Sequence, residues 1–199
     1  MSESNEPAIG LRERKKAKTR AAIQKEALRL FKEQGYEATT VEQIAEAAEV
    51  SPSTFFRYFP TKEDVVFYDV LDPVLIKAYR KQPADMSPIQ ALRAAFGKVY
   101  KGLSAEELAL QQERAELYFN TPELRARMLD DLFKAMEQIA EIIATRVGRN
   151  ADDLAVRTYA GAILGVTISS WFISTDDPEV DLFTKLDAAL AFLESGMPL

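Results

Sequence analysis

Apolar residues recur along this chain three or four positions apart, which is the spacing of amphipathic helices. Between residues 41 and 48, Val41, Ile44, Ala45 and Ala48 form one apolar face. Thr40 precedes this face and Gln43 follows three residues later, so that a capping box is predicted at the helix start. The pattern therefore predicts a short helix that begins directly after Thr40.

A second short helix is predicted after the turn formed by Ala48-Glu49-Val50. Ser51 suits the N-cap, and Pro52 suits the first helical position, where the missing N–H costs nothing. On a helical projection Pro52, Phe55 and Phe59 share one side, and we expect this side to face a core.

The opposite side of this second helix carries Ser53, Thr54 and Arg57, with Phe56 and Tyr58 on its flanks. Small hydroxyls, one arginine and aromatic rings suit contacts with base edges and phosphates in a DNA major groove. A short solvated helix in an unrelated bundle is the alternative. The helix lengths, the caps and the turn together favour a helix-turn-helix.

The remaining pattern predicts an all-α fold of about nine helices, with a three-helix head and a larger helical body. The first helix ends at Gly35, and a helix after Lys62 is expected to kink or break at Asp72-Pro73. Further helices are expected to begin at the following positions: Ser87, Ser104, Thr121-Pro122 (ending at Gly148), Asn150 as a cap and Asp177-Pro178 as a cap (ending at Glu194).

The composition excludes several kinds of chemistry, because the chain contains neither cysteine nor histidine. Disulfides, thiolate catalysis, Ser-His-Asp triads and Cys- or His-ligated metals are excluded, and we expect no catalytic residue, no metal and no cofactor. Acidic pairs such as Asp130-Asp131 and Glu106-Glu107 suggest an enzyme only superficially, since adjacent helical residues do not face each other. A di-iron bundle would need Glu-x-x-His pairs, which a chain without histidine cannot provide.

Charge is distributed unevenly, since residues 1–62 sum to +2 and residues 63–199 sum to −8. A basic first part joined to an acidic remainder fits one DNA-contacting end on a body held away from phosphate. The first ten residues, MSESNEPAIG, lack the apolar core of a signal peptide, so that a cytoplasmic location is expected.

The segment from about Thr19 to Val65 resembles the DNA-binding domain of TetR-type transcriptional regulators. The resemblance is carried by an ordered set of residues: Ala27-Leu28, Leu30-Phe31, Gly35-Tyr36, Thr39-Thr40-Val41, Ile44-Ala45, Ala47-Ala48, Val50-Ser51, Phe59 and Lys62-Glu63. Glu49 stands where the family usually has glycine, which predicts a non-glycine residue near the left-handed region. Phe56 stands where the family usually has tyrosine, so that a phosphate-directed hydroxyl is missing there.

The resemblance implies a DNA-binding domain over residues 11–62, after a disordered tail over 1–10, and a ligand-binding and dimerisation domain over 63–199. The candidate DNA contacts are Thr40, Ser51, Ser53, Thr54, Phe56, Arg57, Tyr58 and Lys62, with Arg14 and Lys15 from the basic start of the first helix. A solvated, frayed helix end is the alternative for Arg14 and Lys15, because positive charge there opposes the helix dipole.

In TetR-like proteins the last two long helices form a four-helix bundle across the dimer axis. Residues 158–175 contain no charge and approach the shortest length of a membrane span. The small residues Gly161, Gly165 and Ser169 fit close approach of a partner helix better, and no membrane partner is expected. The candidate interface residues are Gly161, Gly165, Trp171, Phe172, Leu186, Leu190 and Leu193.

The body also resembles mycofactocin-type TetR regulators around Thr54–Asp64 and Gln111–Met128, and such relatives are associated with long acyl-CoA ligands. The candidate effector contacts are Phe96, Tyr100, Arg114, Leu117, Tyr118, Met128, Leu132 and Met136, although ordinary core packing is the alternative for each. We therefore expect a homodimeric repressor that binds a palindromic double-stranded DNA operator and is released by a small apolar or amphipathic effector. A helical lipid-binding module that has lost DNA binding is the competing hypothesis.

Overall fold

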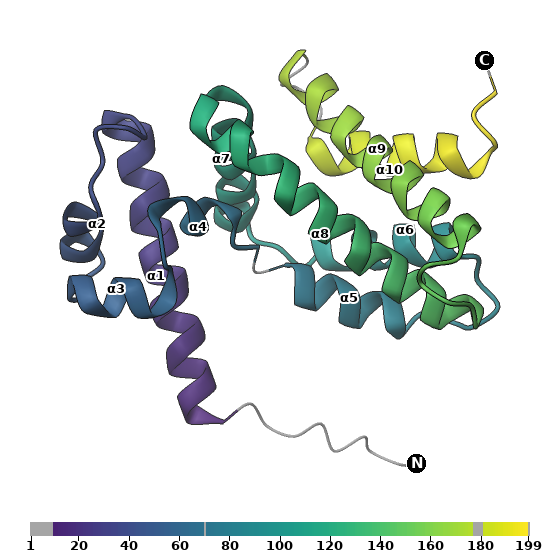
Figure 1. Ribbon diagram of the computed structural model, residues 1–199, viewed down its shortest axis with the longest axis horizontal. Coiled ribbons are helices and arrows are strands. Elements are labelled where there is room, and N and C mark those ends of the chain that lie inside the picture. Colours follow the sequence, from purple (N-terminus) through teal and green to yellow (C-terminus); the bar gives the residue numbers. More distant parts are fainter. Residues whose placement is uncertain (1–9, 70, 177–180, 199) are drawn as a thin grey trace. The chain divides into compact units, whose positions relative to one another are not determined.

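The structure is a computed structural model that describes residues 10–69, 71–176 and 181–198, and for residues 119 and 171–176 it describes no side chain. These ranges contain ten α-helices and no strand, which confirms the all-α class (Figure 1). The helices are α1 (Leu11–Gln34), α2 (Val41–Ala47), α3 (Pro52–Tyr58), α4 (Lys62–Phe67), α5 (Asp72–Arg80), α6 (Pro88–Tyr100), α7 (Ala105–Asn120), α8 (Pro122–Val147), α9 (Leu154–Asp176) and α10 (Leu182–Glu194).

The chain divides into two compact units between Tyr68 and Asp69. α4 packs on α1 and so belongs to the first unit, which places the division further along the chain than the expected boundary after residue 62. A break is present, but not at the expected place: α4 ends at Phe67, and Asp72-Pro73 begins α5. Pro73 lies in the first turn of α5, where its missing N–H is not needed.

The first unit is built around α1, against which α2 and α4 pack, while α3 packs on α2 (Figure 1). Its core is made of apolar side chains from all four helices and from the segments that join them: Ile23, Ala27, Leu28, Phe31, Tyr36, Ile44, Ala45, Phe55, Phe59, Val65 and Val66. Phe55 and Phe59 therefore face the core as expected. Pro52 is exposed, and that part of the prediction is wrong because this first residue of α3 lies at the helix end, outside the packed apolar side.

Side-chain caps set both helices of the helix-turn-helix as the sequence predicted. The Thr40 hydroxyl accepts the Gln43 N–H, and the Gln43 side chain accepts the Thr40 N–H at 2.9 Å. The Ser51 hydroxyl accepts the Thr54 N–H at 3.1 Å. Thr61 and Asp64 form a further capping box at the start of α4. Each cap satisfies N–H groups that the helix itself leaves unpaired.

The turn between α2 and α3 contains a backbone conformation that ordinarily favours glycine. Glu49 has φ of 54°, in the left-handed region, and Val50 N–H then donates to the carbonyl of Ala45 at 2.9 Å. The expectation of a strained residue at this position is confirmed. The conformation costs a non-glycine residue about 1–2 kcal/mol, because its Cβ crowds the following carbonyl.

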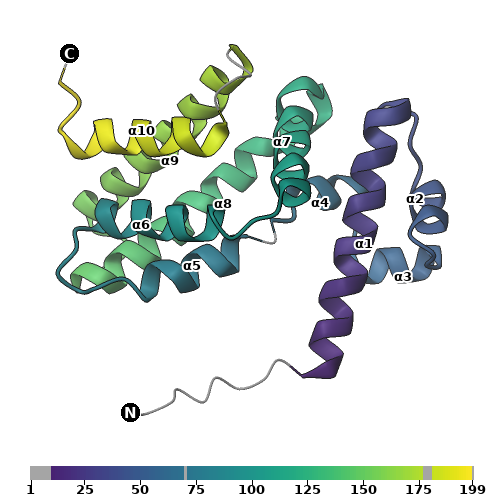
Figure 2. The same cartoon turned by 180° about the vertical axis from the view of Figure 1, so that it is seen from behind.

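The second unit packs α9 against α8 and α10, α5 against α6, and α6 against α10 (Figure 2). Its core draws on α5, α6, α8, α9 and α10, with Tyr79, Leu92, Ile143, Ile163 and Leu190 among the buried side chains. Arg93 of α6 joins α10 through ion pairs with Asp187 at 2.9 Å and Glu194 at 2.7 Å. These contacts hold the C-terminal helix against the body.

Three helix ends of this unit are as expected, and α8 begins after Thr121 without a side-chain cap. Ser87 and Ser104 form capping boxes with Gln90 and Glu107, and Gly148 ends α8 in the left-handed conformation at φ 66°. The expected cap at Asn150 is wrong. Asn150 instead accepts the Asp152 N–H, and α9 begins later, where Asp153 accepts the Ala155 N–H.

The last helix begins later in the chain than expected. The expected capping pair Asp177-Pro178 lies outside them, and α10 begins at Leu182 with the Asp181 carboxylate accepting the Thr184 N–H at 3.0 Å. Within residues 10–69, 71–176 and 181–198, no helix is long and apolar enough to cross a membrane.

Replacing Glu49 with glycine is expected to increase the free energy of unfolding by about 0.5–1 kcal/mol, measured by urea denaturation. The substitution relieves the left-handed conformation, and the gain exceeds the added freedom of glycine in the unfolded chain. Glu46→Gly, in the last turn of α2, is the matched control and should destabilise by about 1 kcal/mol. Equal destabilisation by both substitutions would contradict strain at Glu49.

Candidate functional site

The exposed side of α3 is the surface most suited to contact DNA, and it lies where the sequence predicted. Ser53 and Arg57 are exposed, and Phe56 is 51% exposed. Thr54 and Tyr58 are half-buried at its margins. This set, called the recognition face below, presents hydroxyls, one guanidinium and aromatic edges on a single helix.

The recognition face is held outward by the buried aromatic side of the same helix. Phe55 is fully buried, and its ring contacts that of Phe59 at 6.0 Å and that of Phe56 edge-on at 5.5 Å. At the start of the helix the hydroxyl of Ser51 lies 2.9 Å from those of both Ser53 and Thr54. Burial on one side and capping at the end therefore fix the rotation of α3.

Arg57 lies near the ring of Tyr58, with its guanidinium carbon 5.4 Å from the ring centroid. Arg20 of α1 approaches the same ring from the other helix, at 5.9 Å, and lies closer to the ring of Tyr68, at 4.5 Å. The Arg20 guanidinium also donates to the carbonyl of Tyr58 at 3.4 Å. Sequence reasoning missed this role of Arg20, because the partners lie far apart in the chain.

Lys62, predicted as a DNA contact, binds groups of its own chain. Its ammonium donates to the carbonyls of Tyr36 at 2.9 Å and Thr39 at 3.3 Å, and lies 4.2 Å from the centroid of the Tyr36 ring. The Tyr36 hydroxyl in turn donates to Glu63 at 2.6 Å. These contacts give Lys62 a structural role between α1, α2 and α4.

Glu63 is ionised more readily than an ordinary glutamate. Its partial burial raises the pKa, but hydrogen bonds from the Tyr36 hydroxyl, the backbone and Thr61 outweigh that effect, and the net pKa is lowered. The contact with Tyr36 therefore joins a hydroxyl donor to a carboxylate, which is a strong form of hydrogen bond.

Thr40, Arg14 and Lys15 are exposed, as a DNA contact requires. Arg14 and Lys15 lie in the first turns of α1, where Gly10 provides no side-chain cap. Their contact with phosphate stays a prediction.

The predicted effector residues fall into two groups in the second unit. Phe96 and Tyr100 lie on α6, and the Tyr100 ring stacks on Phe183 of α10 with centroids 4.5 Å apart. Met136 of α8 packs against the core together with Phe96. The other group is on α7 and the first half of α8, and comprises Arg114, Leu117, Tyr118, Met128 and Leu132. All of these except Arg114 are partly accessible.

Arg114 is buried and already has an acidic partner. It is 8% exposed and forms an ion pair with Asp69, the first residue of the second unit. Burial lowers the pKa of Arg114, but the charges of Asp69, Tyr118 and Asp72 outweigh it, so that the guanidinium stays charged. We call Arg114, Asp69, Asp72 and Tyr118 the junction cluster.

Asp72 and Tyr118 respond to the same charges. Partial desolvation and the neighbouring Asp69 raise the pKa of Asp72 to about 6, against the opposing effect of Arg114. Burial raises the pKa of Tyr118 above its usual range, again opposed by Arg114. Sequence reasoning proposed Arg114 as an effector contact but missed both aspartates, since nothing in the local pattern links them to α7.

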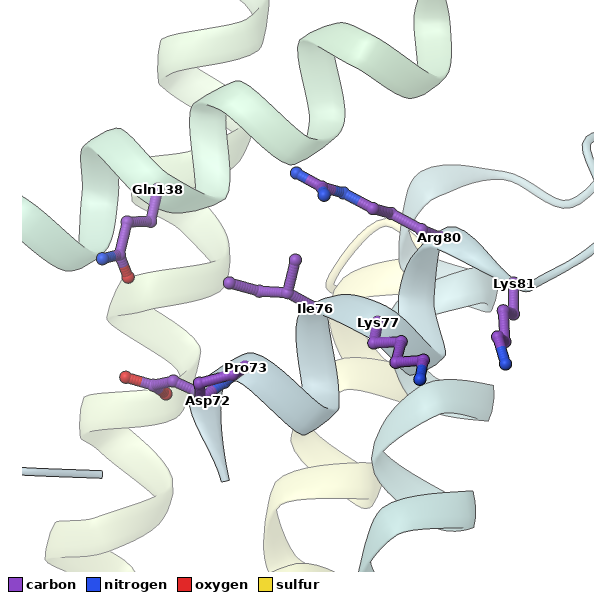
Figure 3. A pocket seen from close by; sticks show the side chains of 7 residues that line it. All are labelled: Asp72, Pro73, Ile76, Lys77, Arg80, Lys81 and Gln138. Carbon is purple, nitrogen blue, oxygen red and sulfur yellow. The ribbon is translucent and has the colours of Figure 1, made fainter. Parts of the chain in front are cut away.

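A groove of about 570 Å³ lies between α5 and α8 and shares no residue with the predicted effector set (Figure 3). Ile76 and Arg80 of α5 are directed toward α8, which contributes Gln138 (Figure 3). The remaining lining residues all belong to α5 or its C-cap: Asp72, Pro73, Lys77 and Lys81. Lys77, Arg80 and Lys81 lie at the C-terminal end of α5, where the helix dipole favours positive charge.

The predicted dimer residues divide into outward and inward positions. Gly165 is exposed and Gly161 half-buried, and an added Cβ at either would meet no atom of this chain within 4 Å. Leu186 and Leu190 are 6% and 0% exposed, so their prediction as interface anchors is wrong: they belong to the chain's own core. Leu193 is partly buried against that core.

The side chains of Trp171 and Phe172, also predicted for the interface, lie outside the described residues. Phe192 of α10 was not predicted, although it is 43% exposed, and it presents a large apolar surface beside the same helices. Because Phe192 follows the buried Leu190 by two residues, it lies on the opposite side of the helix, and the sequence could have predicted its exposure.

Comparison with known proteins identifies both units. Residues 23–68 match the family described as bacterial regulatory proteins of the tetR family, and residues 86–198 match the MftR C-terminal domain. The second match alone covers more than half of the chain. The chain belongs to the TetR family.

Individual relatives support this membership over nearly the full length. The transcriptional regulator TcmR of Streptomyces glaucescens is 38% identical, with 94% of this chain and 85% of TcmR covered. MftR of Mycobacterium tuberculosis, whose name describes transcriptional regulation of mycofactocin biosynthesis, is 29% identical, with 92% and 93% covered. Both are named as transcriptional regulators and not as enzymes.

Among solved structures, the TetR-family repressor FadR of Thermus thermophilus, in complex with lauroyl-CoA, has a TM-score of 0.59. It is 28% identical, and the match covers 90% of this chain and 95% of FadR. The chain is therefore a TetR-type transcriptional regulator with an N-terminal helix-turn-helix and a C-terminal helical domain.

For this TetR-family regulator, Arg57→Ala and Lys62→Ala are expected to act differently. Arg57→Ala should weaken DNA binding and reduce the slope of log affinity against log salt by about 0.9 for each phosphate that it no longer neutralises, with unchanged thermal stability. Lys62→Ala should lower the free energy of unfolding by about 1–2 kcal/mol, because two carbonyls are deprived of a charged donor. Fluorescence anisotropy and urea denaturation measure the two effects.

Lys98→Ala, which removes an exposed lysine of α6, is the control for both measurements. DNA affinity equal to wild type in Arg57→Ala would contradict the predicted recognition face, since Lys62 and Lys98 lie outside that face. It would instead support the competing hypothesis of a module without DNA binding.

Proposed function

We propose that this TetR-family regulator is a homodimeric repressor that binds a palindromic operator and is released by an acyl-CoA-like effector. The observation that carries the proposal is the outward recognition face of a capped, core-anchored α3. Such a helix can enter a major groove with its N-terminal residues toward the base edges.

The recognition face divides into two kinds of contact. Ser53 and Thr54, at the N-terminal end of α3, suit base edges and nearby phosphate, while Arg57 suits guanine or phosphate. Phe56 supplies an apolar surface that fits a thymine methyl group. The proposed contacts with the DNA backbone come from the hydroxyls of Thr40 and Ser51, at the starts of α2 and α3, and from three further residues: Tyr58, Arg14 and Lys15.

Dimerisation is supported by an outward stripe of small residues on α9. Thr158, Gly165 and Ser169 are exposed, with Gly161 half-buried in the same stripe. Small residues let a second helix approach closely, and Phe192 on α10 adds an apolar surface. Two subunits related by a two-fold axis would present two recognition faces, which matches a palindromic operator.

An acyl-CoA-like effector is supported by the relatives and by the composition of the body. The second unit matches the MftR C-terminal domain, and the FadR structure contains lauroyl-CoA. The predicted contacts on α7 and α8 include flexible Met128 and Met136, which adapt to a long aliphatic chain. The buried Arg114 is neutralised by Asp69, so the effector's anionic part must bind elsewhere.

DNA duplexes that the wild-type protein selects from a random pool are expected to contain an inverted repeat. A footprint on such a duplex should cover both half-sites, and lauroyl-CoA should reduce operator affinity by roughly 5–150-fold, the usual range for allosteric coupling. Free coenzyme A and laurate serve as separate controls for the two parts of the ligand. If the protein does not protect the DNA at moderate salt, the repressor proposal is wrong. If it protects the DNA but lauroyl-CoA does not release it, only the proposed effector is wrong.

Gly165→Leu is expected to convert the dimer to a monomer, as measured by analytical ultracentrifugation. The added side chain meets no atom within 4 Å of its Cβ in the chain itself, yet it would separate a close partner helix. Gly10→Leu is the matched control, since its Cβ is equally unobstructed and lies far from α9 in sequence. A Gly165→Leu variant that stays dimeric at micromolar concentration would exclude this face of α9.

A further inference from the structure

The groove between α5 and α8 lies within the second unit, and most of its lining comes from one side of α5. Four lining residues occupy helix positions i, i+3, i+4 and i+7, so that their side chains leave the helix on one face: Pro73, Ile76, Lys77 and Arg80. Tyr79, by contrast, is 2% exposed and belongs to the core. α5 is therefore anchored through Tyr79, while the neighbouring side of the helix lines the groove.

Positive charge is concentrated at one end of this groove. Lys77, Arg80 and Lys81 lie within little more than one helical turn, whereas residues 63–199 as a whole sum to −8. A concave surface that carries one sign of charge strengthens the local potential, because its low-dielectric walls focus the field. The groove is therefore a local attractor for anions on a body whose net charge repels them.

Arg80 has the position and the available donors that an anion site needs. Its side chain is exposed and is directed across the groove toward α8 (Figure 3). Among the described residues its guanidinium has no hydrogen-bond or ion-pair partner, whereas Arg93 and Arg114 of the same unit are paired with carboxylates. A guanidinium presents paired N–H groups that match two oxygens of one phosphate.

The dipole of α5 explains only part of this arrangement. It favours positive charge at the C-terminal end of the helix, whichever side of the helix the residue occupies. A basic side chain that pointed into open solvent would satisfy the dipole equally well. The direction of Arg80 toward α8 therefore needs a second reason, and an anion between the two helices supplies it (Figure 3).

The rest of the lining suits the uncharged part of a phosphorylated molecule. Gln138 of α8 offers an amide that donates and accepts, and Asp72 of the junction cluster offers a carboxylate at the start of α5. Pro73 and Ile76 add apolar surface. This mixture suits hydroxyl and amide groups better than an acyl chain, which needs a continuous apolar surface. The volume of about 570 Å³ is within the usual range for small-molecule sites, roughly 300–1,000 Å³.

We infer that the groove between α5 and α8 binds a phosphate-bearing group, which Arg80 holds together with Lys77 and Lys81. The inference rests on the proposed function, since it gives the anionic part of an acyl-CoA-like effector a site that the paired Arg114 does not offer. A free nucleotide carries the same chemical group and is the second source of the ligand.

The groove and the predicted acyl contacts meet on one helix. Gln138 follows Met136 by two residues on α8, a rise of about 3 Å along the helix axis. The two residues leave α8 on different sides, and Met136 packs against the core. An extended ligand can therefore contact α8 with its phosphorylated end in the groove and its acyl chain on the core side.

The test measures binding to the full-length protein by isothermal titration calorimetry, with lauroyl-CoA, free coenzyme A and laurate as separate probes. Arg80→Ala should weaken the binding of lauroyl-CoA and of free coenzyme A by roughly fivefold, as expected for one charge contact at an exposed site. The binding of laurate should not change, because laurate carries no phosphate. Added salt should reduce the difference between wild type and variant, since it screens exposed charges.

Arg125→Ala is the matched control, because it removes an exposed arginine of α8 that does not line the groove. It changes the net charge by the same amount and should leave the affinity for all three probes unchanged. Arg80→Lys should recover part of the affinity, because it restores the charge without the paired N–H groups. Arg80→Ala should keep the wild-type melting temperature, which separates a lost ligand contact from a lost structural one.

The outcomes separate the inference from the proposed function. If lauroyl-CoA binds wild type and folded Arg80→Ala equally, or if Arg125→Ala loses as much affinity as Arg80→Ala, the inference alone is overturned. If lauroyl-CoA does not bind the wild type but adenosine diphosphate binds in an Arg80-dependent manner, the phosphate site stands and the acyl-CoA effector is wrong. If none of lauroyl-CoA, coenzyme A and adenosine diphosphate binds the wild type, both are wrong.

Discussion

Helix ends are the constraint on which this structure depends, because each end leaves backbone donors or acceptors without an intrahelical partner. In the DNA-binding unit, Thr40, Ser51 and Thr61 satisfy the donors at the starts of α2, α3 and α4. Gln24 of α1 binds carbonyls at the end of α4, and Lys62 binds carbonyls between α1 and α2. The recognition face depends on this arrangement, since it is the remaining outward side of α3.

The same principle connects recognition with regulation. The first part of the chain is more basic than the acidic body, which fits the proposal that only the first part meets phosphate of DNA. At the start of the second unit, the buried guanidinium of Arg114 lies near the carboxylates of Asp69 and Asp72. A regulator of this kind needs no catalytic group, because differential binding in two conformations is sufficient to control occupancy of DNA.

The sequence by itself determined the all-α class, the helix-turn-helix and most helix ends. Those features depend on periodicity and on caps within four residues, as at Thr40 with Gln43. The resemblance likewise identified the family from an ordered set of residues, among them Tyr36, Lys62 and Glu63, which the structure shows in contact. Such local and ordered signals can be read without knowing the packing.

Only the tertiary structure decided which side of each long helix is buried and which charges meet. Leu190 looked like an interface anchor, but a helix packed by its own chain on one side leaves different residues outward, such as Phe192. Lys62 was predicted as a DNA contact and Arg114 as an effector contact, but only the structure shows that they pair with carbonyls and with Asp69 within the chain. Periodicity gives the spacing of a face, whereas the partner of a face or of a charge depends on segments far away in the chain.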